Sequence, residues 1–146
     1  MTMSRAYLDA CVAIYFVEQH PTLGPRVEAA LFPPTGPQVT PVISDLTRLE
    51  CRVLPMRNQE HGLIARYDTF FNLPDCDCAA LDAATFDLAT ELRALYALKT
   101  PDALPLAAAI RSGCREFWTH DGRLAKAAVR LCTTAPSATP CGRRPR

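Results

Sequence analysis

The chain has 146 residues, which is enough for one globular domain with a sizeable buried core. Hydrophobic residues make up 49% and charged residues 21%, and a net charge of +1 excludes binding to nucleic acid through a strong overall positive field. The apolar run at residues 10–17 is too short to span a membrane and lacks the flanks of a secretory signal. We therefore expect a soluble cytoplasmic protein.

The first part of the chain predicts two strands, each followed by a helix. Residues 5–8 form a short apolar strand that ends at Asp9, and apolar residues then recur at helical spacing. A loop rich in proline and glycine, with a short helix near 26–31, leads to a second strand at 39–43. Pro41 lies inside this strand and predicts a position near a sheet edge.

Ser44 is a good N-cap for a helix that we expect to bend or break near Pro55, with a further helix over 58–71. The predicted inward face of the first of these helices carries Leu46, Leu49 and Val53. A short strand is predicted within 73–80, followed by a helix that Asp82 caps and whose apolar face carries Ala84, Leu88, Leu92 and Leu95. The next helix is opened by Thr100 and Pro101. A strand at 116–119 and a helix at 123–131 complete the series.

Strands that alternate with helices predict an α/β fold, a three-layer α/β/α sandwich around a central parallel sheet. No internal repeat is visible. We expect one domain over residues 1–132 and a flexible basic tail over 133–146, where Pro, Ser, Thr and Arg dominate.

Four acidic residues lie at element boundaries or on a predicted inward face. Asp9 and Asp121 each follow a predicted strand, Glu50 lies beside Leu49 on its helix, and Asp102 is in the first turn of another helix. Ligands bind at the carboxyl ends of strands in open α/β sheets, and buried carboxylates need a counter-charge. Mg²⁺ or Mn²⁺ would supply it, although turn closure, helix capping and pairing with a neighbouring arginine are simpler explanations for each acid taken alone.

The helix that carries Asp102 has two possible registers because Pro105 follows closely. If Thr100 is the cap, Pro105 lies inside the helix and removes a backbone hydrogen bond. If Asp102 is the cap, Pro105 falls in the first turn, where its missing N–H costs little. We expect the second register because it is energetically cheaper.

The seven cysteines are odd in number and irregular in spacing, which favours reduced thiols. Cys76 and Cys78 could hold part of a zinc site, but no second pair completes it. Cys51 and Arg57 match the Cys-x5-Arg spacing of cysteine phosphatases, but the intervening residues are bulky and predicted helical, so we treat the match as a coincidence.

Four segments in order resemble the PIN-domain ribonucleases, specifically the VapC-type toxins of bacterial toxin–antitoxin pairs: "YLDACVAIY", "SDLTRLECRVLPMR", "LKTPDALPLAAAI" and "FWTHDGRLAKAA". The resemblance runs from Tyr7 to about Leu131. It implies a compact α/β/α sandwich and Mg²⁺- or Mn²⁺-dependent cleavage of RNA, kept silent by a cognate antitoxin. By the same resemblance the acidic metal site is formed by Asp9, Glu50, Asp102 and Asp121.

Two positions depart from the family pattern, since Pro105 stands where relatives commonly have histidine and His120 where they usually have asparagine. Possible contacts to phosphate or RNA are Ser44, Arg48 and Arg52, although Ser44 more simply caps a helix and the arginines more simply form a solvated face. We also expect a complex with an antitoxin partner, formed by homodimers of the chain. The apolar parts of 58–71 and 92–96 are candidates for the antitoxin and dimer surfaces. The alternative function is a catalytically weak or inactive PIN-like module that sequesters antitoxin or RNA.

Overall fold

The computed structural model describes residues 4–132, so the predicted tail over 133–146 lies outside the described residues. Its strands are β1 (Ser4–Leu8), β2 (Val39–Ser44), β3 (Asp77–Ala79) and β4 (Glu116–Trp118). They form one parallel sheet in the order β3-β2-β1-β4. The predicted parallel sheet is therefore confirmed.

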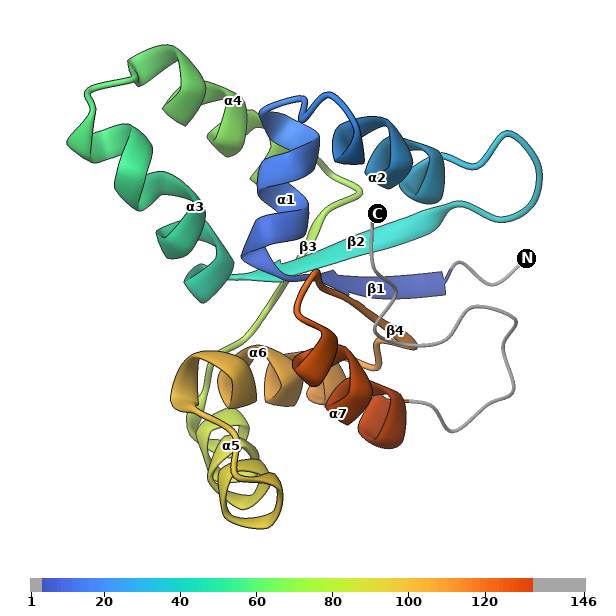
Figure 1. Cartoon of the computed structure of the whole chain (residues 1–146), viewed down its shortest axis with the longest axis vertical. Helices are drawn as coiled ribbons and strands as arrows, with labels where there is room; N and C mark the ends of the chain where they lie inside the picture. Colours follow the sequence, from blue (N-terminus) through green and yellow to red (C-terminus); the bar gives the residue numbers. More distant parts are fainter. Residues whose placement is uncertain (1–3, 133–146) are drawn as a thin grey trace.

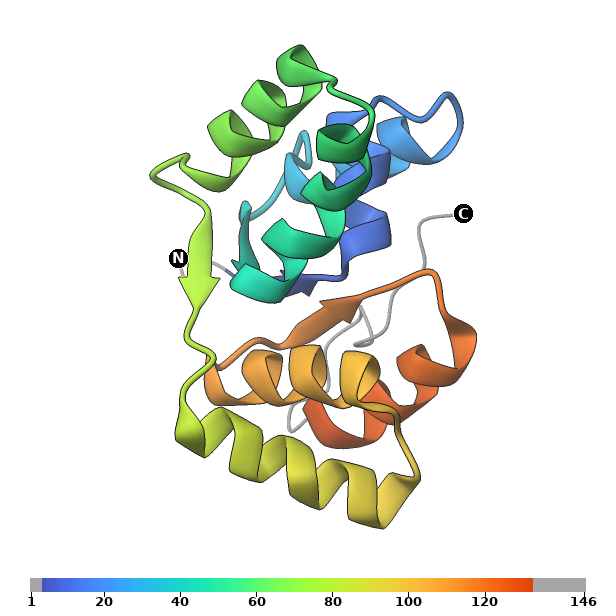
Figure 2. The ribbon, with the colours of Figure 1, turned by 90° about the vertical axis from the view of Figure 1, so that its left-hand side faces the viewer.

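Helices cover both faces of this sheet (Figures 1 and 2). One face carries α1 (Ala10–Val17), α2 (Leu23–Leu31), α3 (Asp45–Arg57) and α4 (His61–Phe71); the other carries α5 (Ala83–Tyr96), α6 (Thr100–Arg111) and α7 (Gly122–Cys132). The three-layer α/β/α prediction is thus confirmed. Within the described part of the chain, every helix is too short or too polar to cross a membrane.

The strands alternate their side chains between two apolar cores, as expected for a sheet covered on both faces. Ala6 and Leu8 of β1 face the core beneath α1 and α2, while Tyr7 between them faces the core beneath α5 and α6. Tyr7 stacks on Phe117 of β4 with ring centroids 5.3 Å apart. This packing holds β1 beside β4 and fixes where the chain leaves each strand.

The two proline predictions hold in a modified form. β2 is not the edge strand, but β3 pairs only with Val42–Ser44, so at Pro41 the strand has a neighbour on one side alone and the missing N–H is tolerated. α3 continues past the buried Pro55 and ends at Arg57, so the predicted break falls two residues after the proline.

The predicted inward face of α5 is also partly wrong. The buried residues of this helix are Thr85, Ala89 and Leu92, whereas Leu95 is 74% exposed. Asp82 caps α5 as predicted, since its Oδ1 accepts a hydrogen bond from the Thr85 N–H at 3.0 Å. An alanine-rich helix offers apolar residues on several sides, so the pattern alone does not identify the side that packs against α6.

Candidate metal site at the carboxyl edge of the sheet

Asp9 and Asp121 follow the two neighbouring strands β1 and β4. Asp9 comes directly after β1, and its N–H donates to the carbonyl of Trp118 at the end of β4 at 3.0 Å. Asp9 caps α1, since its Oδ1 accepts from the Ala10 N–H at 2.9 Å. Asp121 caps α7 in the same way, accepting from the Arg123 N–H at 2.9 Å. The local sequence thus places both carboxylates at one edge of the sheet.

The buried side chain of Thr119 links the segment of Asp9 to the segment of Asp121. Its side chain is fully buried, and its Oγ1 donates to Asp9 Oδ2 at 2.8 Å. The same oxygen accepts from the Asp121 N–H at 3.1 Å. A threonine hydroxyl can donate once and accept twice, so one side chain can fix both segments. Thr119 was not predicted from the sequence as a site residue. Its position directly after β4 and two residues before Asp121 was the feature that could have indicated it.

Two of the four predicted acids, Asp9 and Glu50, have raised pKa values. Burial raises the pKa of Asp9, hydrogen bonds from Thr119 and Ala10 oppose the rise, and the charges of Asp102 and Asp121 add to it. Partial burial raises the pKa of Glu50, and the charges of Asp9 and Asp102 add to it. Contacts join three of the four segments, because Thr119 bridges Asp9 and the Asp121 backbone and Arg123 contacts both Asp121 and Asp102. That all four acids form one metal site stays a prediction.

Glu50 lies on the exposed side of α3, and the predicted inward face of that helix is partly wrong, because only Leu46 packs against the core. Leu49 is 60% and Val53 49% exposed, whereas the buried residues of α3 are Thr47, Cys51 and Pro55. The helix carries apolar residues on two sides, and the side spaced by four residues packs against α1 and α4. Glu50 is thus accessible to a bound ion or substrate.

A buried hydroxyl network attaches α3 to β1. Tyr7 Oη lies 2.7 Å from Ser44 Oγ and 3.2 Å from Thr47 Oγ1, and the Ser44 N–H donates to Thr47 Oγ1 at 3.1 Å. Ser44 is fully buried and forms a capping box with Thr47. Ser44 is thus held in the capping box, and its suggested contact with phosphate stays a prediction. The network fixes the helix that carries Glu50 to the strand that precedes Asp9.

Asp102 lies in the first turn of α6, but in neither of the predicted registers. The helix begins at Thr100 with Lys99 as its N-cap, and Asp102 makes no capping bond. Pro105 is therefore inside the helix, where it cannot donate to the carbonyl of Pro101. Pro105 is buried, and the packing of this apolar helix in the core offsets the lost hydrogen bond. The Asp102 carboxylate instead lies 3.6 Å from the guanidinium of Arg123.

Arg48 and Arg52 are already paired along α3. Arg48 Nη1 lies 3.1 Å from Asp45 Oδ1, and Arg52 Nη1 lies 3.3 Å from Asp68 Oδ1 on α4. Each is partly exposed, so a contact with RNA would have to replace or extend these pairs. Their role toward RNA stays a prediction.

The donor set fits a hard divalent cation that keeps part of its water shell. All four candidate ligands are carboxylates, the oxygen donors that Mg²⁺ and Mn²⁺ prefer. Within the described residues, no three His, Cys, Asp or Glu side chains are arranged to hold an ion directly. Mg²⁺ usually takes one or two carboxylates and several waters, so the remaining acids would act through water.

The phosphatase-like spacing of Cys51 and Arg57 is indeed a coincidence. Both residues belong to α3, so no loop can surround a phosphate between them. Cys51 is buried, and burial raises the pKa of its thiol well above the ordinary value. A thiolate nucleophile needs the opposite shift.

The layers, the strand order and the acidic carboxyl edge define an α/β/α domain with a candidate cation site. The sequence matches the family model of the PIN domain over residues 6–130. The chain belongs to the PIN domain family, as the sequence segments predicted. No curated protein matches the sequence as a relative.

Solved structures with this fold include proteins of toxin–antitoxin systems. A toxin–antitoxin complex from Klebsiella pneumoniae shares 23% identity, with a TM-score of 0.58 over 80% of this chain and 86% of that one. VapBC2 from Rickettsia felis, bound to a DNA fragment from its promoter, shares 15%, with a TM-score of 0.65 over 84% and 92%. VapC20 of Mycobacterium tuberculosis, a toxin that cleaves the sarcin–ricin loop, shares 15%, with a TM-score of 0.67 over 84% and 94%. At these identities the likeness concerns the fold.

Proposed function

We propose that the protein is a Mg²⁺- or Mn²⁺-dependent endoribonuclease that acts as the toxin of a toxin–antitoxin pair in the cytoplasm. The observation that carries the proposal is the buried Thr119 hydroxyl, which holds the Asp9 carboxylate and the Asp121 backbone together where β1 and β4 end. Both acids are located where an α/β sheet binds ligands, in a chain of the PIN domain family. The negative charge of these acids at the carboxyl edge of the sheet fits the binding of a cation that in turn binds phosphate.

A bound divalent cation would neutralise phosphate charge and favour ionisation of an attacking water. Asp9 is the best fixed ligand, because the Ala10 N–H and the Thr119 hydroxyl hold its two oxygens. Glu50 is exposed beside it and is free to orient water or to accept its proton. Asp102, in the first turn of α6, and Asp121, at the start of α7, would add negative charge from the other face of the sheet. Hydrolysis would leave the RNA cut at an internal phosphodiester bond.

The antitoxin has a candidate binding surface away from the acids. An open groove of about 740 Å³ lies between α1, α2 and α4, lined by apolar residues such as Phe16, Val17 and Phe70. Arg66 and Glu28 are among its polar residues. We place the antitoxin here because the groove is apolar and because the structural neighbours include toxin–antitoxin complexes.

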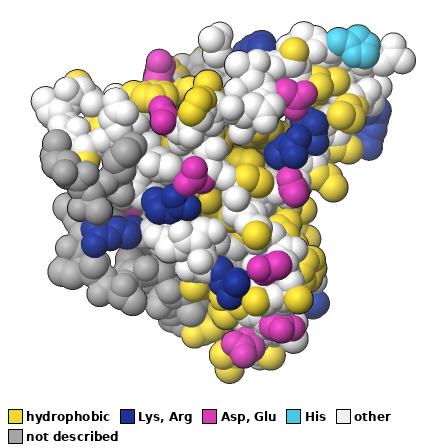
Figure 3. Space-filling view, turned by 180° about the vertical axis from the view of Figure 1, so that it is seen from behind, with side chains coloured by type: hydrophobic (Ala, Val, Ile, Leu, Met, Phe, Trp, Pro, Cys, Tyr) yellow, Lys and Arg dark blue, Asp and Glu magenta, His cyan; other side chains and the backbone are white. Residues whose placement is uncertain are grey.

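The two segments expected to form the antitoxin and dimer surfaces differ in how much apolar surface they expose. In 58–71 the large apolar residues Tyr67, Phe70 and Phe71 are buried, so α4 presents little to a second copy. In 92–96, Leu95 and Tyr96 are exposed on α5, and α3 adds Leu49 and Val53. Figure 3, a view from the side opposite to Figure 1, shows hydrophobic side chains scattered over that face and acidic ones gathered at its lower end. A homodimer is proposed through α3 and α5.

The function is tested by incubating purified protein with a mixed-sequence RNA after dialysis against a chelator. We expect no cleavage without metal, and internal cuts after Mg²⁺ or Mn²⁺ is added. Preparations of the Asp9→Asn variant made in parallel control for a contaminating nuclease. Metal-dependent RNA binding without cleavage would instead support a PIN-like binding module. Cleavage that persists unchanged in chelator would contradict the proposed metal dependence.

A further inference from the structure

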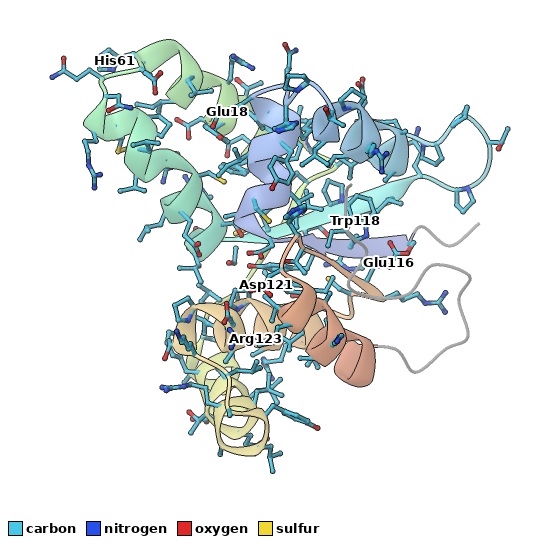
Figure 4. All side chains as sticks on the ribbon, in the orientation of Figure 1. Glu18, His61, Glu116, Trp118, Asp121 and Arg123 are labelled. Carbon is cyan, nitrogen blue, oxygen red and sulfur yellow. The ribbon has the colours of Figure 1, made fainter. Side chains whose placement is uncertain are left out.

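One positively charged residue, Arg123, contacts two of the four acids. Arg123 was not among the site residues predicted from the sequence. Arg123 Nη2 lies 3.6 Å from Asp102 Oδ2, and the Arg123 N–H donates to Asp121 Oδ1 at 2.9 Å. Among the side chains that the structure describes, no other Lys or Arg lies within ion-pair distance of any of the four acids. Figure 4 shows Asp121 and Arg123 together at the start of α7, beside α6.

The contact between Arg123 and Asp102 is easily exchanged. The side chain of Arg123 is 67% exposed and that of Asp102 23%, so water screens the pair. Exposed pairs of this kind shift an equilibrium by a factor of at most about five. By contrast, Arg48 and Arg52 each have a shorter contact with an acid outside the site. Arg123 is therefore the arginine best placed to leave its partner when a stronger cation arrives.

We propose that Arg123 is the phosphate-binding residue of this site, which rests on the proposed function. In the metal-free protein it neutralises Asp102. The Arg123 guanidinium would leave Asp102 if that carboxylate bound a divalent cation, because the two would compete for it and like charges repel. An RNA phosphate that approaches the cation then meets a free arginine, whose planar fork binds two phosphate oxygens at once. Anchoring at the helix start by Asp121 keeps this movement within the length of one side chain.

A phosphate-binding Arg123 differs from a purely structural arginine in its expected effects on Mg²⁺ affinity and on RNA affinity. Replacing Arg123 should strengthen Mg²⁺ binding in the absence of RNA, because a competitor for Asp102 is removed. It should also weaken RNA binding in the presence of Mg²⁺, because one phosphate contact is lost. Arg111 provides a matched control, since its Nη2 lies 3.7 Å from Asp82 Oδ2 in another exposed pair, at the far end of α6.

The test compares Arg123→Gln with Arg111→Gln. By calorimetry without RNA, we expect Arg123→Gln to bind Mg²⁺ roughly two- to fivefold more tightly than the parent. In single-turnover cleavage with Mg²⁺, we expect its half-saturating RNA concentration to rise several-fold. The slope of log affinity against log salt should decrease by about 0.7, the value of one phosphate contact on single-stranded RNA. Arg111→Gln should match the parent in all three measurements.

Two results would overturn the proposal. If Arg123→Gln behaves like Arg111→Gln in Mg²⁺ affinity and in the salt slope, Arg123 binds neither competitively nor to phosphate. If Mg²⁺ binding weakens in Arg123→Gln, the residue positions Asp102 for the metal rather than competing for it. A parent protein that neither binds Mg²⁺ nor cleaves RNA would overturn the proposed function, and this inference with it.

Discussion

Asp9→Asn is expected to lower the rate of RNA cleavage at least about 100-fold, since losing even an indirect partner of a metal ligand costs 10- to 100-fold. The fold should persist because the asparagine Oδ1 can still accept from the Ala10 N–H and cap α1. Initial cleavage rates with Mg²⁺ at neutral pH measure the loss. Asp87→Asn, an equal change on the exposed surface of α5, should keep the parent rate. Parent-level cleavage by Asp9→Asn would remove Asp9 from the site.

The same variant should be at least as stable as the parent at neutral pH without metal. The raised pKa of Asp9 means that, between its ordinary unfolded value of about 3.9 and its folded value, the folded protein holds the proton more firmly than the unfolded chain. The free energy of unfolding therefore falls as pH rises through this window and stays lower above it. Asparagine carries no charge and avoids that loss. Denaturant unfolding of both proteins measures the difference, and a marked destabilisation of Asp9→Asn at neutral pH would contradict it.

Mg²⁺ binding is expected to strengthen with pH through the raised pKa values of Asp9 and Glu50, and to level off above them. Each proton that the cation must displace can contribute up to about tenfold in affinity per pH unit below the pKa of its carboxyl group. Because the carboxylates interact, the protons leave in coupled steps that belong to the group rather than to one residue.

Calorimetry in two buffers of different ionisation heat measures this coupling. Below the plateau the apparent binding enthalpy should differ between the buffers in proportion to the protons released, and on the plateau it should agree. Tyr7 also borders the site, but burial raises the pKa of its hydroxyl far outside this range, so it does not contribute. Equal enthalpies and equal affinities at every pH would contradict a cluster of acids with raised pKa values.

The fold could be predicted from the sequence because each strand is followed by a change in hydrophobic periodicity. Asp9, Asp82 and Asp121 cap the helices that follow, and such local signals survive in the structure. The parallel sheet follows from this alternation, since parallel strands need helical connections. The position of Asp9 and Asp121 at one edge follows in turn from the parallel arrangement.

Predictions failed where the outcome depends on which of two similar faces packs against a neighbour. The apolar residues of α3 lie on two sides, so Leu49 and Val53 could not be distinguished from Cys51 by pattern. The register of α6 was misjudged because local cost favoured Asp102 as the cap, whereas core packing fixed Lys99 there. Neither the buried contact of Thr119 nor the ion pair of Arg123 has a periodic signature. Arg123 lies more than 20 positions from Asp102 along the chain, and Thr119 lies more than 100 positions from Asp9. Such contacts between distant residues leave no mark on the local pattern.

The shared cation is tested most directly by counting bound Mn²⁺, using electron paramagnetic resonance of the free ion, in the parent protein and in three single variants. The variants are Asp9→Asn, Glu50→Gln and Asp102→Asn, which remove one charge each from three different elements. We expect the parent to bind Mn²⁺ and each variant to lose roughly tenfold or more in affinity for that same ion. Unchanged Mn²⁺ affinity in all three variants would contradict a site built by these carboxylates.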